Sequence, residues 1–115
     1  MIFHIAHRSE WDSAIDSGEY RVLCRGATID EEGFIDASTA EHLSATALRF
    51  SADDTGPLVV LGIEEDRIAA SGVELHWEPT PAGELFPHIY GVILPHWVAT
   101  VHDAAIVDGR FDARA

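Results

Sequence analysis

The sequence predicts an α+β fold with a small, mostly antiparallel sheet and short helices, formed by one domain over residues 1–115. Two observations carry this prediction. Segments with helical periodicity come early in the chain, whereas runs of strand-forming apolar residues dominate its second half. With 115 residues, of which 47% are apolar, the chain matches the usual size and composition of a domain with one core. The pattern does not give the order of the strands.

The first third of the chain predicts two short strands and one helix. Ile2–Ile5 is apolar apart from one residue and is typical of a strand. Ser9 is a suitable N-cap for the helix that follows, and Gly18 is a suitable end for it. Strand-forming residues return at 20–23, whereas the polar and acidic stretch 26–33 predicts a surface loop.

The middle of the chain predicts a strand, a capped helix and a central strand. Residues 33–38 form a short apolar run into a turn, and Ser38 with Glu41 matches a capping box for a second helix. That helix is expected to bury Leu43, Ala47 and Phe50. Residues 53–57 predict a turn, and 58–63 is the longest strand-forming run of the chain.

The last third predicts further strands separated by polar connections. A polar crossover begins at 64–68, and apolar residues then alternate at Val73, Leu75 and Trp77, as in a strand. Two more strands are expected at 89–94 and 98–102. Residues after Asp108, about the last seven of the chain, are expected to be frayed.

The chain is strongly acidic. Its formal charge of −13 comes from 20 acidic residues against seven basic ones, all of them arginines. Such a surface repels phosphate backbones, so the sequence excludes a nucleic-acid partner. A small anionic ligand is still compatible with the sequence, because a few arginines or backbone amides act locally.

Composition also limits location and chemistry. The sequence has no apolar run long enough to span a bilayer and no basic region ahead of an apolar stretch at its start, so we expect no membrane segment and no signal peptide. Its one cysteine, Cys24, has no partner for an internal disulfide, which fits a cytoplasmic location. The seven histidines lack the spacing of a metal-binding motif, so no metal ligands are assigned.

Two segments carry the best candidate residues. His4 interrupts an apolar strand, and such a histidine is either structural or part of a site. His88 and Tyr90 are two residues apart, so in a strand they share one face, and Gly91 permits close approach of another backbone or a ligand. A turn with packed aromatic residues explains this segment equally well.

The turn at Ser38 and Thr39 has two interpretations as well. Ser38 is a plain helix cap, or the capped helix start binds an anion through free amides. Asp36 lies two residues earlier and can face the same way. Arg49 is a candidate cation for the same ligand, although a surface ion pair is the simpler role for an arginine among so many acids.

The chain resembles a known bacterial family over most of its length. The matching segments are Ile2-Phe3-His4-Ile5, Glu32-Gly33-Phe34-Ile35, Ser38-Thr39-Ala40-Glu41, Arg49-Phe50, Trp77-Glu78 and Leu85-Phe86-Pro87-His88-Ile89-Tyr90-Gly91. They are similar to domain-of-unknown-function family 952, roughly from residue 1 to residue 103. The family has no established activity.

The resemblance implies a fold like that of the ADP-ribosyltransferase group, a small, mostly antiparallel split β-structure with short helices. The enzymes of that group bind NAD in a cleft. Its usual polar positions would fall to His4, to Ser38 or Thr39, and to His88 with Tyr90. NAD is then a candidate substrate, and no cofactor is required. The family usually has a histidine where this chain has Asp36.

Three interpretations follow from these residues. The chain is an enzyme acting on NAD, ADP-ribose or a related nucleotide, with His4, Asp36 and His88 as catalytic residues and Ser38, Thr39, Tyr90 and Arg49 as ligand-binding residues. Alternatively, it is a non-catalytic module that binds a small ligand or regulates a partner. The third interpretation is a histidine–aspartate metal site with hydrolytic chemistry. The sequence does not predict the oligomeric state.

Overall fold

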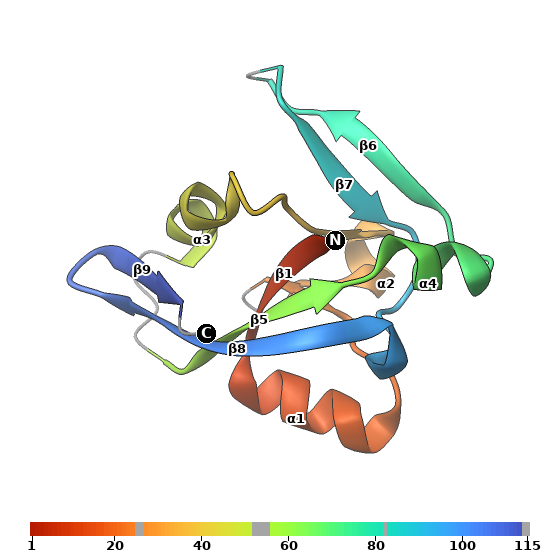
Figure 1. Ribbon diagram of the computed structural model, residues 1–115, viewed down its shortest axis with the longest axis horizontal. Helices are drawn as coiled ribbons and strands as arrows, with labels where there is room; N and C mark the ends of the chain where they lie inside the picture. The colour runs from red at the N-terminus through yellow and green to blue at the C-terminus, as the bar shows by residue number, and fades with distance from the viewer. Residues whose placement is uncertain (25–26, 52–55, 82, 114–115) are drawn as a thin grey trace.

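Short helices and antiparallel strands alternate along the chain (Figure 1). The computed structural model describes residues 1–24, 27–51, 56–81 and 83–113. The elements in order are β1 (Ile2–His7), α1 (Arg8–Ser17), β2 (Val22–Cys24), β3 (Ala27–Thr28), α2 (Ile29–Glu32), β4 (Ile35–Asp36), α3 (Leu43–Ser51), β5 (Leu58–Ile63), α4 (Glu65–Ala70), β6 (Leu75–Pro79), β7 (Leu85–Ile89), the 3-10 helix η1 (Pro95–Trp97), β8 (Val98–Val107) and β9 (Arg110–Ala113).

The strands form three antiparallel sheets. One has the order β1-β5-β8-β9, the second has β4-β7-β6, and the third is the pair β2-β3. A bridge between Phe3 and Ser38 connects the two larger sheets. Figure 1 shows β6 and β7 as a hairpin that projects from the body of the molecule. The predicted α+β class with a small, mostly antiparallel β-structure is therefore confirmed.

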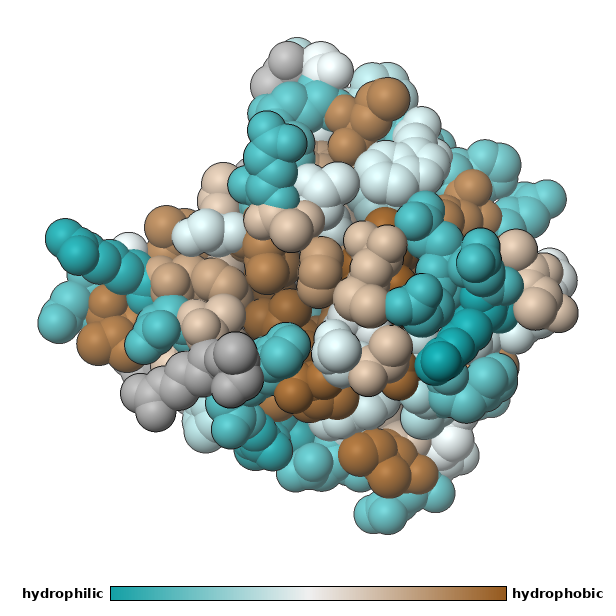
Figure 2. Space-filling model, in the orientation of Figure 1, coloured by the Kyte–Doolittle hydropathy of each residue, from teal (hydrophilic) through white to brown (hydrophobic). Residues whose placement is uncertain are grey.

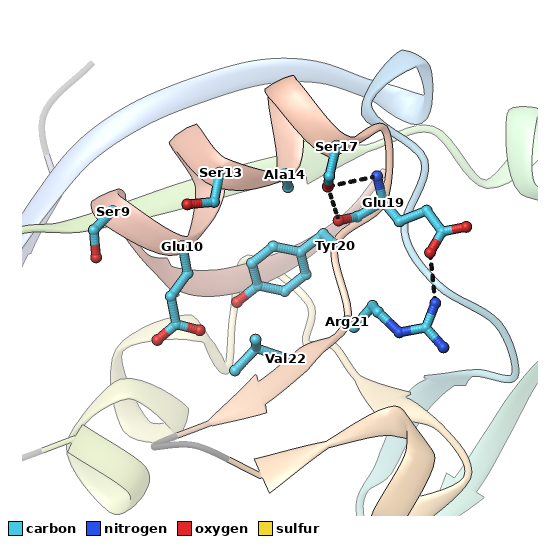
Figure 3. A pocket seen from close by; sticks show the side chains of 9 residues that line it. All are labelled: Ser9, Glu10, Ser13, Ala14, Ser17, Glu19, Tyr20, Arg21 and Val22. Carbon is cyan, nitrogen blue, oxygen red and sulfur yellow. Dashed lines mark hydrogen bonds and ion pairs between the residues drawn. The ribbon is translucent and has the colours of Figure 1, made fainter.

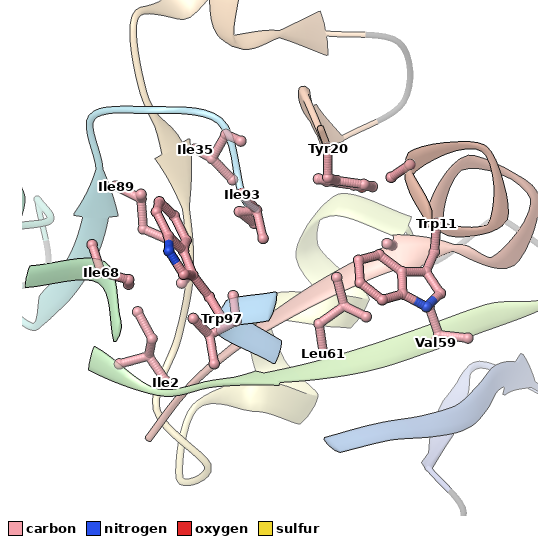
Figure 4. Packing of buried hydrophobic residues seen from close by; sticks show 14 residues of the cluster. Ile2, Trp11, Tyr20, Ile35, Val59, Leu61, Ile68, Ile89, Ile93 and Trp97 are labelled. Carbon is pink, nitrogen blue, oxygen red and sulfur yellow. The ribbon is translucent and has the colours of Figure 1, made fainter. Parts of the chain in front are cut away.

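Two apolar clusters hold these sheets together. In β1, Ile2 and Ala6 face the larger cluster, where Figure 4 shows Trp11, Tyr20 and Trp97 among branched aliphatic residues. The alternate β1 residues, including Phe3, face a smaller cluster that contains Ala47 of α3. Figure 2 also shows hydrophobic residues at the centre of this face, where Figure 1 has β1 and β5, within a hydrophilic rim.

The predicted central strand is confirmed, because all six residues of β5 are buried and β5 lies between β1 and β8. Gly18 ends α1 as predicted: its φ is 88°, and its N–H donates to the carbonyl of Ala14 at 2.8 Å. The proposed cap at Ser9 is wrong, since α1 already begins at Arg8. None of the described helices is long and apolar enough to cross a bilayer.

Two acidic stretches predicted as connections contain helices. The stretch 26–33 includes β3 and α2, because Ile29 packs against the core and its N–H donates to the carbonyl of Arg21 at 2.9 Å. In α4, the fully buried Ile68 gives the polar segment an apolar anchor. One apolar side chain that packs against the core, partly buried in Ile29 and fully buried in Ile68, thus orders each helix despite its charged neighbours. The predicted turn at 53–57 falls largely outside the described residues.

The end of the chain is more ordered than predicted. Asp108 and Gly109 have φ angles of 50° and 73°, the conformation of a tight hairpin turn. This turn folds β9 back onto β8, with Val107 paired to Arg110. The prediction of frayed residues after Asp108 is therefore wrong for 110–113.

Candidate functional site

The three-stranded sheet presents a face of histidines, carboxylates and aromatic rings. His88 of β7 pairs directly with Asp36 of β4 and with His76 of β6. Directly paired residues project from the same side of a sheet. We call this side the outer face; it carries Asp36, His76, Glu78, Phe86 and His88. The opposite side carries Ile35 and Ile89, which lie in the core.

His88 and Glu78 form a hydrogen-bonded pair on the outer face. Nδ1 of His88 contacts Oε2 of Glu78, and the Tyr90 hydroxyl donates to the same oxygen at 2.6 Å. The expectation that His88 and Tyr90 share a face is confirmed. The carboxylate holds the ring proton on Nδ1, so Nε2 carries the lone pair. Within the described part of the chain, that Nε2 has no hydrogen-bond partner, and the His88 side chain is 21% exposed.

Aromatic rings fix the orientation of His88. Phe34 stacks on its imidazole, with ring centroids 4.2 Å apart and an interplanar angle of 18°. Tyr90 lies 5.7 Å from Phe34 and meets the ring of His76 edge-on at 5.1 Å. Together, these rings form an apolar wall beside a polar group with a free acceptor nitrogen. Such a combination is typical of a small-molecule site.

Hydrogen bonding shifts the pKa values of the Glu78 carboxyl and the Tyr90 hydroxyl. The hydrogen bond from Tyr90, and after it the one from His88, hold the pKa of the Glu78 carboxyl below its usual value. The same bond raises the pKa of Tyr90 above its usual value of 10.0. The contribution of Glu78 to stability is therefore present above its unfolded-state pKa and lost as the pH falls through its folded-state pKa. The contribution of Tyr90 is present below its unfolded-state pKa and lost as the pH rises through its folded-state pKa.

Tyr90 ionisation is expected to depend on Glu78. In a Tyr20→Phe background Tyr90 is the sole tyrosine, and its ultraviolet absorbance should titrate with a midpoint above 10.0. Glu78→Gln removes the negative charge, so the midpoint should move down towards that value. Equal midpoints with and without Glu78→Gln contradict the Tyr90–Glu78 contact.

His4 projects from β1 on the same side as Ile2 and Ala6, towards the larger apolar cluster and away from the outer face. It is 3% exposed, and its Nδ1 donates to the carbonyl of Asp36 at 2.7 Å. Its Nε2 lies 3.2 Å from the carbonyl of Val22 and 3.3 Å from the Tyr20 hydroxyl. Both ring nitrogens are therefore occupied within the protein. This geometry favours the structural interpretation of His4 over a role in holding a ligand.

Ser38 follows β4 but does not cap a helix. It exchanges two backbone hydrogen bonds with Phe3, at 2.7 and 2.8 Å, and α3 begins only at Leu43. The predicted capping box with Glu41 is therefore wrong. Because Ser38 pairs with Phe3, its side chain projects away from the side of β1 that carries His4. Its hydroxyl is buried and has no hydrogen-bond partner among the described residues.

Ser38→Ala is therefore expected to change stability little. Removing an unpaired buried hydroxyl removes its desolvation cost, which offsets the small loss of packing. We expect the free energy of unfolding of Ser38→Ala to lie within about 0.5 kcal/mol of the wild-type value, or slightly above it. If Ser38 capped a helix, Ser38→Ala would instead lower the free energy of unfolding by about 1 kcal/mol. A loss of that size in the melting experiment contradicts the present geometry.

A second cluster lies at the end of the outer face nearest α3. Oγ1 of Thr39 is 3.1 Å from Nδ1 of His42, and Nε2 of His42 contacts Oε2 of Glu84. The His42 ring meets Phe86 edge-on at 5.3 Å. His42 and Glu84 thus tie the turn before α3 to the hairpin of β6 and β7.

The remaining predicted residues are placed as follows. Arg49 lies in α3, but its side chain is outside the described part of the structure. Asp36 lies on the outer face opposite His88. At Gly91 an added Cβ would lie 2.8 Å from a methyl carbon of Val73, so the predicted close approach involves a packed side chain. Among the described residues, no group of three or more His, Cys, Asp and Glu side chains is arranged to hold a metal ion.

The sequence did not predict five residues of these two clusters: Phe34, His42, His76, Glu78 and Glu84. Strand pairing brings His76 and Glu78 beside His88, and Phe34 stacks on the His88 ring. The turn before α3 brings His42 between Thr39 and Glu84. A local signal existed for Glu78, which lies two residues beyond His76 in a predicted strand and so shares its face. No comparable signal connected the distant Phe34 to His88.

A separate open pocket of about 350 Å³ lies between α1 and residues 19–22 (Figure 3). Ser9, Ser13 and Ser17 line it from one side of α1. The charged side chains that line it already have partners. Arg21 donates to Glu19 at 2.5 Å and to Asp30, outside the pocket lining, at 2.9 Å. Nδ1 of His7 lies 3.1 Å from Oε1 of Glu10. The buried Tyr20 closes the pocket towards the core. This pocket therefore offers a ligand fewer unpaired polar groups than the outer face does.

The fold and the site define a small α+β domain with a histidine–carboxylate–aromatic face. The sequence profile of DUF952, a protein family of unknown function, matches residues 5–101, so the chain belongs to this family. The crystal structure of protein CC0527 from Caulobacter crescentus is similar, with a TM-score of 0.81 and 28% identity over 96% of this chain and 92% of that one. A double mutant of CC0527 gives the same TM-score and coverage at 29% identity. No curated protein matches the chain.

Proposed function

We propose that the chain binds a small ligand with a planar ring on the outer face and that His88 acts on it as a general base. The single observation that carries this proposal is the His88–Glu78 pair, in which the carboxylate holds Nδ1 and leaves Nε2 free. A histidine oriented by a carboxylate in this way is the usual arrangement for proton transfer. Asp36 and His76, each directly paired with His88 in the sheet, are further polar groups beside it.

The charge of the outer face selects the kind of ligand. Glu74, Glu78 and Glu84 line the hairpin, and Asp36 faces His88. These carboxylates repel phosphates but attract a cationic ring, which can stack against the rings of Phe34 and Tyr90. The nicotinamide ring of NAD carries a positive charge. The nicotinamide–ribose end of NAD is therefore the part of the molecule that fits this face.

The proposed chemistry is transfer or hydrolysis at the bond between nicotinamide and ribose. Nε2 of His88 accepts the proton of the attacking water or hydroxyl group. Glu78 supplies the negative charge that stabilises oxocarbenium character on the ribose. An ADP-ribosyltransferase-like fold, with small antiparallel sheets joined at their edges, is consistent with this proposal.

A thermal-shift panel tests the proposal. Wild type is melted with NAD, nicotinamide riboside, ADP-ribose and inorganic phosphate, and Glu78→Gln serves as the matched variant. A ligand at a hundred times its Kd adds about 2.7 kcal/mol, which raises Tm by several degrees. We expect stabilisation by NAD and nicotinamide riboside, reduced in Glu78→Gln, and none by phosphate.

Other patterns in the panel have defined meanings. Stabilisation by ADP-ribose and phosphate alone contradicts the selection of a cationic ring. Binding of nicotinamide riboside without any release of nicotinamide supports the alternative of a non-catalytic binding module, and it removes the general-base role of His88. A panel without any shift contradicts the proposed ligand class.

A further inference from the structure

We propose that Thr39, His42 and Glu84 form a second catalytic centre, which hydrolyses activated acyl esters. The proposal is independent of the ligand proposed for His88. It rests on a hydroxyl, an imidazole and a carboxylate in contact in that order. A nucleophile within reach of a base that a third group orients is the arrangement by which weak hydroxyl nucleophiles are activated.

The geometry suits proton removal from Thr39. The distance of 3.1 Å between Oγ1 and Nδ1 of His42 is within the range for a nucleophile and its base. Glu84 accepts the Nε2 proton of His42, which leaves the lone pair on Nδ1, facing the hydroxyl. The buried Phe86 packs edge-on against the ring and restricts its rotation.

Access and charge stabilisation are both available at this centre. The side chains of His42 and Glu84 are 28% and 43% exposed, so a substrate can reach them. Within the described part of the chain, the backbone N–H groups of Ala40 and Glu41 donate no hydrogen bond. They directly follow the nucleophile in the chain, the position from which a backbone amide commonly stabilises the oxyanion of acyl transfer.

The reaction balances with water as the only co-reactant. Oγ1 of Thr39 attacks the ester carbonyl, and its proton passes to Nδ1 of His42. The C–O bond to the leaving group breaks, and His42 returns the proton to the departing alkoxide, leaving an acyl-threonine. Water then attacks the acyl carbon with His42 as base, which releases the carboxylic acid and restores the Thr39 hydroxyl.

The experiment is acetylation by p-nitrophenyl acetate, followed by release of p-nitrophenol and by mass spectrometry of the quenched protein. We expect an acetyl group on residue 39 in wild type and in Thr39→Ser. Thr39→Val keeps the shape but removes the hydroxyl, so the adduct should vanish and hydrolysis should fall at least tenfold. Glu84→Gln should slow acetylation while leaving Thr39 in place.

Two controls distinguish hydrolysis at this centre from hydrolysis by other histidines and from the effects of unfolding. His96→Gln removes an exposed histidine in η1 and should leave hydrolysis unchanged. A melting curve for each variant confirms that it is folded, and Thr39→Ser must retain the adduct. Equal hydrolysis in folded Thr39→Val, or acetylation only at residues other than Thr39, overturns the proposal. Loss of nicotinamide release in His88→Ala with ester hydrolysis retained shows that the two centres are separate.

Discussion

His4→Ala is expected to destabilise the fold by about 2–4 kcal/mol, because it removes buried hydrogen bonds and leaves a cavity. The ring of His4 joins three segments distant in sequence: it donates to the carbonyl of Asp36 and contacts both Val22 and Tyr20. Without the ring, the Asp36 carbonyl loses a buried donor. Chemical denaturation measures the change directly, and Tm should fall by about 10 °C or more.

Tyr20→Phe is the matched control for this prediction. It keeps the aromatic packing and removes the hydroxyl that lies 3.3 Å from Nε2 of His4. Its cost should be about 1 kcal/mol, clearly less than that of His4→Ala. If His4→Ala keeps wild-type stability but loses ligand binding, His4 belongs to the site and its structural assignment is wrong.

His88→Ala is expected to lower turnover of the ring-bearing substrate by about a hundredfold to ten-thousandfold, the usual contribution of a general base. The fold should persist, since the His88 side chain is partly exposed and its hydrogen bond is to the partly exposed Glu78. Steady-state kinetics and a melting curve on the same preparation give both quantities. His4→Ala and His88→Ala thus have opposite signatures, one in stability and one in activity.

The matched variant for His88 is Phe34→Leu. It removes the ring stacked on His88 at 4.2 Å and keeps an apolar side chain beside it. We expect weaker binding of the planar ligand with a smaller loss of turnover than in His88→Ala. Unchanged turnover in a folded His88→Ala variant contradicts the proposed role of His88.

Much of the fold could be predicted from local patterns. The apolar run 58–63 correctly predicted the buried central strand, and Gly18 correctly predicted the end of α1. Both features depend on only a few neighbouring residues, an apolar run for the strand and a glycine for the left-handed backbone. The hairpin turn at Asp108 and Gly109 carried a known dipeptide signal that the acidic and polar context obscured. The acidic helix α4 was missed because a single residue, Ile68, anchors it.

The site could be predicted only in part, because its geometry depends on which strands pair. His88 and Tyr90 share a face by simple alternation, and the structure agrees. His4 and Ser38 were expected to line one cleft, but Ser38 pairs with Phe3, so the two side chains take opposite sides. Strand pairing also brings Glu78 to His88, and no local pattern contains that information.

The most direct test of the outer face as the ligand site is a map of backbone amide chemical shifts in ¹⁵N-labelled protein during titration with nicotinamide riboside. We expect the perturbed amides to cluster at Phe34, Asp36, Glu78, His88 and Tyr90, and their shifts to saturate with a single Kd. Perturbations confined to the pocket between α1 and residues 19–22, or the absence of any saturable change, would contradict the proposal that the outer face binds the ligand.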